Sequence, residues 1–205
     1  MDKTRLIYKE RTPSMQITNN KDYPVLVRTG VWDENNKKSE HFISTPPFFK
    51  MDPSDKNIIK VINIKKGLPT DRESLNWLCV ENIPPTEKNT GIKREKRTEN
   101  ISISVRGCIK LIYRPAAIND PDFTEVSKDI SWRRGNGKIT VSNSSPYYIS
   151  FGTVKFDNTP VPEVLYVKPF STESFQSNAR NVSEVSWNMI NDIGGTTAMQ
   201  NTKVQ

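Results

Sequence analysis

Residues 100–115, which read NISISVRGCIKLIYRP, carry the most restrictive pattern in the chain. Between Ile101 and Tyr113 every odd position except Gly107 holds an apolar residue. Alternation of this kind has the period of a β-strand with one apolar face. At about 3.3 Å per residue such a strand extends about 43 Å, well beyond the usual strand of five or six residues. The pattern therefore predicts an unusually long strand whose apolar face needs a cover.

The sequence before this stretch is a series of short β-type runs separated by Pro, Asn, Asp and Gly. Seven strands in about 115 residues predict an antiparallel sandwich of the immunoglobulin type. Pro46 and Pro47 interrupt the fourth run, which predicts an edge strand that breaks or changes sheets. The predicted strands cover residues 4–10, 14–20, 24–34, 42–52, 57–64, 74–83 and 101–115.

A second β-rich region follows the segment RPAAINDPDF (114–123), whose two prolines and Asn-Asp pair predict a linker. The last run of this region ends on Gly-Gly, a hairpin turn signal. Its strands are predicted within residues 129–145, 147–158, 161–172 and 182–195. A chain of 205 residues suits two domains of about 100 each. We therefore predict an all-β protein with domains at 1–117 and 122–205 and a linker at about 115–121.

Composition places the chain among globular proteins, with 34% hydrophobic and 26% charged residues. No stretch approaches the ~18 apolar residues of a membrane span, and the first residues lack the apolar core of a secretory signal. If the protein is exported, we expect this to be its mature form. The net charge of +7 permits an anionic partner without selecting one. Its dense run at 93–97 is either a solvated loop tip or a contact surface, and no aromatics interleave with basic residues as nucleic-acid binding requires.

The two cysteines, Cys79 and Cys108, each lie in a predicted strand. Two adjacent antiparallel strands would bring them within bridging distance, and two unrelated buried thiols are the alternative. A disulfide would stabilise the fold by about 3–4 kcal/mol in the chain-entropy model and would indicate an oxidising compartment. Residues for catalysis are scarce, because His41 is the single histidine and no nucleophile elbow or phosphate-binding loop is present. We predict no enzyme, no metal site and no cofactor.

The stretch LPTDRESLNWLCVENIPP (68–85) resembles the signature of the periplasmic chaperones of the chaperone–usher pathway, the PapD-like family that assembles bacterial pili and surface fibres. The Leu-Pro opening, the run from Asp71 to Leu75, Trp77, Cys79 and the Ile-Pro-Pro ending all fit. Further segments match in family order, so the resemblance covers nearly the entire chain. They are Thr4–Arg5, Thr45–Pro47, Ile109–Leu111, Tyr113–Ala117 and Ile190–Gly195.

The resemblance implies two immunoglobulin-like β-sandwich domains in an L-shaped, boomerang arrangement. In the family, a cysteine pair joining the last two strands of the first domain marks a subclass with a longer loop between those strands. The chain resembles this subclass and is similar to the chaperone of the capsule antigen. Cys79 and Cys108 match that pair.

The resemblance also implies a use for the long strand. Pilin subunits are similar to sandwiches that lack their final strand, and the chaperone lends its own seventh strand, an arrangement called donor-strand complementation. On the matching positions the donated side chains are Ile101, Ile103 and Val105. Each such residue contributes about 1.5–3 kcal/mol when fully buried. The alternative is that these residues face the core of their own domain.

Two sets of charges match family positions. Arg5 and Lys110 match two cleft cations that hold the C-terminal carboxylate of the subunit. Strict alternation puts Lys110 on the face opposite the donated side chains, which predicts a bulge, a twist or a cleft at the sheet edge. Glu73, Arg114 and Asp192 match a trio of charges that bridges the two domains. Ordinary surface charge is the alternative for both sets.

The function that the resemblance implies is binding. The protein would capture fimbrial subunits in the periplasm, assist their folding, prevent premature polymerisation and deliver them to an outer-membrane usher. The alternative from another class is a secreted two-domain adhesion or structural module whose apolar strand mediates homophilic contacts. An apolar edge promotes aggregation when it is unfilled, so we expect the free protein to cover it by self-association or with its own N-terminal segment.

Overall fold

The computed structural model describes residues 1–83, 104–135, 137–161, 166–176 and 182–204. Contacts between Cα atoms divide the chain into two compact units. The first unit comprises Met1–Leu6, Arg11–Lys66 and Asn76–Leu111, and the second comprises Ile7–Glu10, Gly67–Leu75 and Ile112–Gln205. No helix in the described part of the chain is long and apolar enough to cross a membrane.

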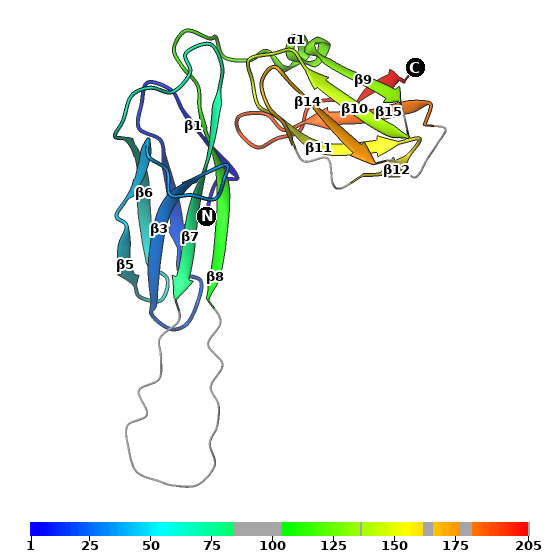
Figure 1. Cartoon of the computed structure of the whole chain (residues 1–205). Coiled ribbons are helices and arrows are strands. Elements are labelled where there is room, and N and C mark those ends of the chain that lie inside the picture. Colours follow the sequence, from blue (N-terminus) through cyan, green and yellow to red (C-terminus); the bar gives the residue numbers. More distant parts are fainter. Residues whose placement is uncertain (84–103, 136, 162–165, 177–181, 205) are drawn as a thin grey trace, which may run out of the picture. The chain divides into compact units, whose positions relative to one another are not determined.

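The larger sheet of the first unit has five strands in the order β1-β8-β7-β3-β5, and Figure 1 shows β8, β7 and β3 side by side. β3 and β7 pair antiparallel along nearly their whole length, from Leu26 opposite Ile83 to Asp33 opposite Asn76. The strands are β1 (Arg5–Tyr8), β3 (Val25–Asp33), β5 (Phe48–Met51), β7 (Ser74–Ile83) and β8 (Val105–Tyr113).

The second sheet of this unit has three strands in the order β2-β6-β4. They are β2 (Ser14–Thr18), β6 (Lys56–Asn63) and β4 (Phe42–Thr45). The run predicted at 42–52 breaks at Pro46 and Pro47, because β4 pairs with β6 in this sheet whereas β5 pairs with β3 in the other. The prediction that this edge strand changes sheets is confirmed.

The core of the first unit lies between the two sheets. The alternating apolar residues of the strands fill it, as a two-sheet sandwich requires. Ile59 and Val61 of β6 and Leu78 of β7 are fully buried, and Leu111 of β8 joins them. The intervening residues of β6, such as Lys60, are exposed. One face of each strand is therefore the core face, which defines the opposite face as the outer one.

The second unit is also built from paired strands, in the orders β14-β10-β9 and β12-β11-β15-β16, with β13 paired to β11. Its core holds a cluster of aromatic rings in which Trp132 lies 5.5 Å from Phe151 and 6.3 Å from Trp187 between centroids. The strands are β9 (Ile130–Gly135), β10 (Lys138–Asn143), β11 (Ile149–Phe156), β12 (Thr159–Pro160), β13 (Tyr166–Val167), β14 (Ser171–Gln176), β15 (Glu184–Met189) and β16 (Gln200–Lys203). All-β architecture with two sandwiches of paired sheets confirms the predicted fold class.

Several short elements of the second unit were not predicted, among them β12, β16 and a helical segment. The strand β16 pairs with β15, but its residues QNTK lack apolar alternation, so the period gave no signal. The helix α1 (Phe123–Val126) precedes a 3-10 turn, η1 (Ser127–Asp129), and is capped by Asp122, whose side chain accepts from the Thr124 N–H. The predicted strand positions Ile101 and Ile103 and the basic run at 93–97 lie outside the described residues.

Candidate functional site

The described part of β8 keeps the alternation of the sequence and so presents two different faces. Ile109 and Leu111 point into the core and are buried, which places Lys110 between them on the outer face. In β1 the core residue is Leu6, so Arg5 also belongs to the outer face. Because β1 and β8 are neighbours in the sheet, the alternation itself brings the two predicted cations together. The position of Lys110 follows from the strand period.

The two cations act on each other electrostatically. Burial, and to a smaller extent the charge of Arg5, together lower the pKa of Lys110 from 10.5 to about 8. The folded protein therefore carries the cost of burying this charge below about pH 8, and the cost is relieved as the pH rises from 8 towards 10.5. A carboxylate placed beside Lys110 and Arg5 would offset their repulsion, since it accepts hydrogen bonds from both kinds of cation.

Val105 begins β8 and is 65% exposed, although it lies on the same face as Ile109. It lines a pocket of about 380 Å³ together with Val25, Val27 and Met51, all of which are buried. Residues of β2 also line the pocket, so it opens between the two sheets of the first unit. An exposed apolar side chain at the mouth of an apolar pocket can enter another polypeptide. Val105 is not sealed beneath its own sandwich.

The edge of β8 is only partly covered. β1 has four residues and β8 has nine, so about half of β8 extends beyond the strand that pairs with it. Residues before β1 turn towards β2, where the Asp2 N–H donates to the Gln16 carbonyl at 3.2 Å. The Met1 side chain lies against Gly107, where a Cβ would stand 2.9 Å from the Met1 Cε. The N-terminal segment thus touches β8 at Gly107, while covering of the strand edge and self-association stay predictions.

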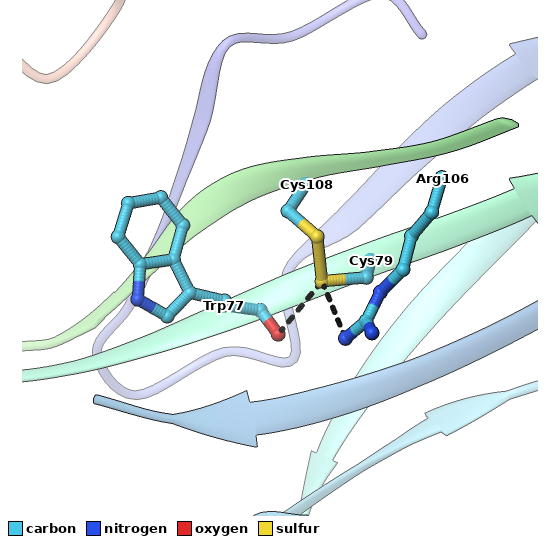
Figure 2. The surroundings of a disulfide bond; sticks show 4 residues. All are labelled: Trp77, Cys79, Arg106 and Cys108. Atoms are coloured by element: carbon cyan, nitrogen blue, oxygen red, sulfur yellow. Dashed lines mark hydrogen bonds between the residues drawn. A yellow bond between two sulfur atoms is a disulfide. The ribbon is translucent and has the colours of Figure 1, made fainter. Parts of the chain in front are cut away.

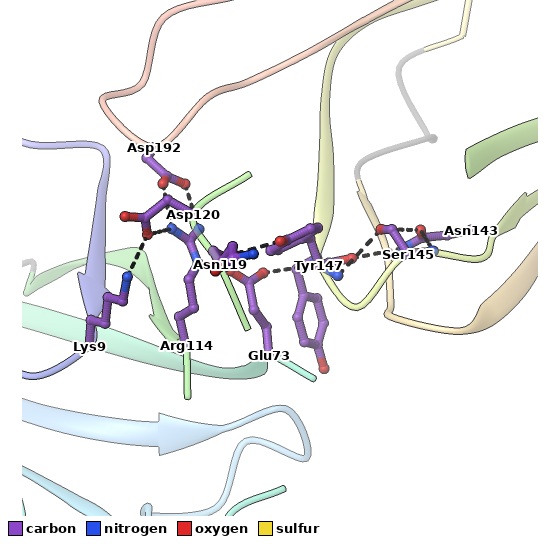
Figure 3. Close-up of polar contacts among 10 residues, drawn as sticks. Lys9, Glu73, Arg114, Asn119, Asp120, Asn143, Ser145, Tyr147 and Asp192 are labelled. Carbon is purple, nitrogen blue, oxygen red and sulfur yellow. Dashed lines mark hydrogen bonds and ion pairs between the residues drawn. The ribbon is translucent and has the colours of Figure 1, made fainter. Parts of the chain in front are cut away.

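Glu73, Arg114 and Asp192, which the sequence predicted as a trio, are in direct contact (Figure 3). The Arg114 Nε donates to Glu73 at 2.8 Å, and its two terminal nitrogens donate to the two oxygens of Asp192 at 2.7 and 2.9 Å. The other Glu73 oxygen accepts from the Tyr148 N–H at 2.7 Å. Arg114 also donates to Asp120 at 3.0 Å, a partner that was not predicted although it lies in the Asn-Asp pair of the linker segment.

Two charges of this cluster, those of Arg114 and Glu73, are buried, and both are hydrogen-bonded. Arg114 is 2% exposed and Glu73 is 3% exposed, so neither is an ordinary surface charge. Burial raises the pKa of Glu73, an effect that the Arg114 guanidinium opposes. Burial also lowers the pKa of Arg114, but its bonds and charge contacts with Asp192 and Glu73 more than offset this, and the net shift is upward. All three residues belong to the second unit, and a role in setting the angle between domains stays a prediction.

Cys79 and Cys108 form a disulfide between β7 and β8, which confirms the predicted pairing. Figure 2 shows the bond with Trp77 on one side and Arg106 on the other. Sequence reasoning did not find the Arg106 contact, because it depends on how β8 lies against its neighbour β7. Among the described residues, no group of three His, Cys, Asp or Glu side chains could hold a metal ion.

Comparison with known families matches both halves of the chain. Residues 1–119 match the family described as pili and flagellar-assembly chaperone, PapD N-terminal domain. Residues 125–201 match the family described as pili assembly chaperone PapD, C-terminal domain. The two matches together span nearly the whole chain.

Individual proteins agree with these matches. The chaperone protein CssC of Escherichia coli is 46% identical over 203 residues, which cover 97% of this chain and 88% of CssC. The chaperone protein caf1M of Yersinia pestis is 30% identical and covers 98% of this chain, with 83% of caf1M covered. The crystal structure of the Escherichia coli chaperone DraB superposes with a TM-score of 0.86 at 31% identity, covering 100% of this chain and 95% of DraB. The chain belongs to the family of PapD-like pili assembly chaperones.

Proposed function

We propose that this protein is a periplasmic chaperone that binds fimbrial subunits by donor-strand complementation, keeps them from polymerising early and delivers them to an outer-membrane usher. It works by binding and not by catalysis. Its relatives support the class of partner, since CssC is a chaperone protein and the SafB chaperone was solved in complex with the SafA pilin of Salmonella enterica. SafB superposes with a TM-score of 0.87 at 25% identity and covers 98% of this chain and 94% of its own.

The observation that carries the proposal is the pairing of two features on one strand. Val105 offers an exposed apolar side chain at the start of β8, and Lys110 lies five positions further on, next to Arg5. At about 3.3 Å per residue the two lie roughly 17 Å apart along the strand. A subunit whose C-terminal carboxylate sits between the cations would thus have its sandwich in register with Val105. Ile101 and Ile103 would extend the same apolar row.

The remaining predicted residues receive structural roles in this proposal. The Glu73, Arg114 and Asp192 cluster holds together segments that are far apart in the sequence. The domain limits of 1–117 and 122–205 are kept as proposed. The disulfide ties β8 to β7, so that the donor strand is anchored to its own sheet at one end.

Co-expression with a fibre subunit from the same organism tests the proposal. A soluble 1:1 complex should form, and Arg5→Ala and Lys110→Ala should each abolish it, because each removes one cation of the carboxylate site. Lys50→Ala is the matched control, since Lys50 is an exposed cation of β5 that pairs with Asp52. Complexes of full strength in both variants would show that the carboxylate anchor is wrong. The alternative adhesion module predicts self-association with rising concentration and no subunit complex.

A further inference from the structure

The two sulfurs of the disulfide differ in exposure. Cys79 lies on β7, in the interior of the sheet, and is 2% exposed. Cys108 lies on β8 and is exposed. Both side chains are on the outer face, because their neighbours Leu78 and Ile109 point into the core. A reagent that approaches from solvent therefore meets the Cys108 sulfur first.

A guanidinium lies against the buried sulfur. The Nη2 atom of Arg106 is 3.5 Å from the Cys79 Sγ (Figure 2). The same guanidinium stacks on the Trp32 ring, with its Cζ 3.8 Å from the ring centroid, which holds it in place. The indole of Trp32 in turn lies over Gly30, where any Cβ would stand only 2.6 Å from the ring. Gly30 is the residue opposite Cys79 in the pairing of β3 with β7, so the cation is fixed over this position.

The disulfide also borders an open space. A pocket of about 440 Å³ is lined by both cysteines, Arg106, Trp32 and Trp77, with acidic residues at its margin. This is far larger than the share of about 30 Å³ that one water occupies in the liquid, so a small thiol fits. The indoles give the pocket apolar walls, and the guanidinium gives it one positive charge. The positive charge lies directly beside the disulfide, whereas Asp33 and Glu34 line the pocket as well, so the charge acts on the sulfurs and does not select the reagent.

We propose that the native disulfide is a site of thiol–disulfide exchange that reacts in one direction. The Cys108 sulfur is attacked, and the Cys79 sulfur is the leaving group. The incoming thiolate forms a new S–S bond with the Cys108 Sγ. The bond between Cys79 and Cys108 breaks, and its electron pair stays on the Cys79 Sγ as a thiolate. The attacking sulfur is oxidised and the Cys79 sulfur is reduced, so the electrons balance. With a dithiol partner, the second thiolate then releases Cys108 and the partner leaves as a disulfide.

Two physical effects set this direction. Exchange rates depend on which sulfur can be reached and on how well the leaving thiolate is stabilised. Exposure favours attack at Cys108, and the Arg106 cation stabilises the thiolate that forms on Cys79. Attack on the Cys79 sulfur would require a reagent to displace Arg106 from it. The sense of exchange does not depend on the proposed binding of fimbrial subunits.

Peptide mapping of the native protein tests this direction of exchange. The oxidised protein is incubated with reduced glutathione without denaturant, quenched with N-ethylmaleimide and analysed by mass spectrometry. Glutathione should be found on Cys108 and maleimide on Cys79, in a ratio of about ten to one or more. Glutathione on Cys79, or equal labelling of the two, would overturn the proposal.

Reduction kinetics test the role of Arg106. Arg106→Gln should slow reduction of the native disulfide by dithiothreitol about three- to tenfold, and Arg106→Lys should restore part of the rate because it restores the cation. Arg28→Gln is the matched control, since Arg28 lies on the same sheet and pairs with Glu81. The rate should rise in proportion to the thiol concentration. A rate that is independent of thiol concentration and equal to the rate of unfolding would place the attack in the unfolded chain and overturn the proposal.

Discussion

At the scale of single residues, Lys110 links the cost of folding to the proposed function. The side chain is half-buried beside Arg5, and burial lowers its pKa to about 8. A surface lysine would avoid this cost, so the position is unfavourable for the isolated protein. The sequence predicted which two cations meet. It could not predict the shifted pKa, because the shift depends on how completely neighbouring elements exclude water.

This shift predicts how subunit binding varies with pH. The carboxylate binds the charged form of Lys110, which predominates below pH 8 and is lost as the pH rises above it. The affinity for a fimbrial subunit should therefore be constant between about pH 6.5 and 7.5 and should fall by up to about tenfold per pH unit above 8. Titration calorimetry or fluorescence titration measures the affinity across this range.

Lys110→Arg provides the control for this pH dependence. Arginine stays charged throughout the range, so the variant should bind with an affinity that does not change between pH 7 and 9.5. An equally steep fall in the variant would assign the pH dependence to another group and remove Lys110 from the explanation.

At the scale of elements, β8 has two faces with different tasks. One face packs Ile109 and Leu111 into the core and carries the exposed Val105, while the other carries Arg106, Cys108 and Lys110. Alternation in the sequence identified this strand and its apolar row, whereas the role of Lys110 came from the family resemblance. Alternation did not reveal that Arg106 reaches the Cys79 sulfur, which depends on how β8 lies against its neighbour β7. The same limit explains why β16, whose short polar sequence has no period, was missed.

Val105→Asp separates binding from folding within this strand. Because Val105 is 65% exposed, the substitution should change the free energy of unfolding by no more than about 0.5 kcal/mol in urea. It should weaken subunit binding about 10- to 100-fold, since about 1.5–3 kcal/mol of apolar burial is lost in the complex. Ile43→Asp is the control, because Ile43 is an exposed apolar residue on the other sheet, and it should bind normally. Full binding by Val105→Asp would mean that the donated face is misassigned.

At the scale of the whole molecule, the two compact units are stabilised in different ways. The first has a disulfide, while the core of the second is built around the aromatic cluster of Trp132, Phe151 and Trp187. The resemblance to a known family predicted two sandwiches. It did not predict that residues 7–10 and 67–75 would be grouped with the second unit, because that grouping depends on contacts between distant segments.

Removing the disulfide should therefore affect the units unequally. The double variant Cys79→Ala with Cys108→Ala should lose about 3–4 kcal/mol of stability, as expected for a bridge that spans 29 residues. Hydrogen–deuterium exchange read by mass spectrometry should be faster in peptides from β3 and β7 and unchanged in those from β11 and β15. Equal acceleration in all of these peptides would show that the two units unfold as one.

The Arg114 cluster has a consequence for how this protein can be divided. Glu73 enters the cluster from a segment that precedes β8 in the sequence, whereas its partner Tyr148 comes from far beyond β8. Asp192, which accepts from Arg114, also lies far beyond β8. A gene fragment encoding only residues 112–205 would keep Asp192 and Asp120 but would leave Arg114 without Glu73, its most buried carboxylate partner. Because the second unit takes residues from three separate segments, no single cut in the chain yields it intact. Recombination between related genes would therefore have to exchange all three segments together.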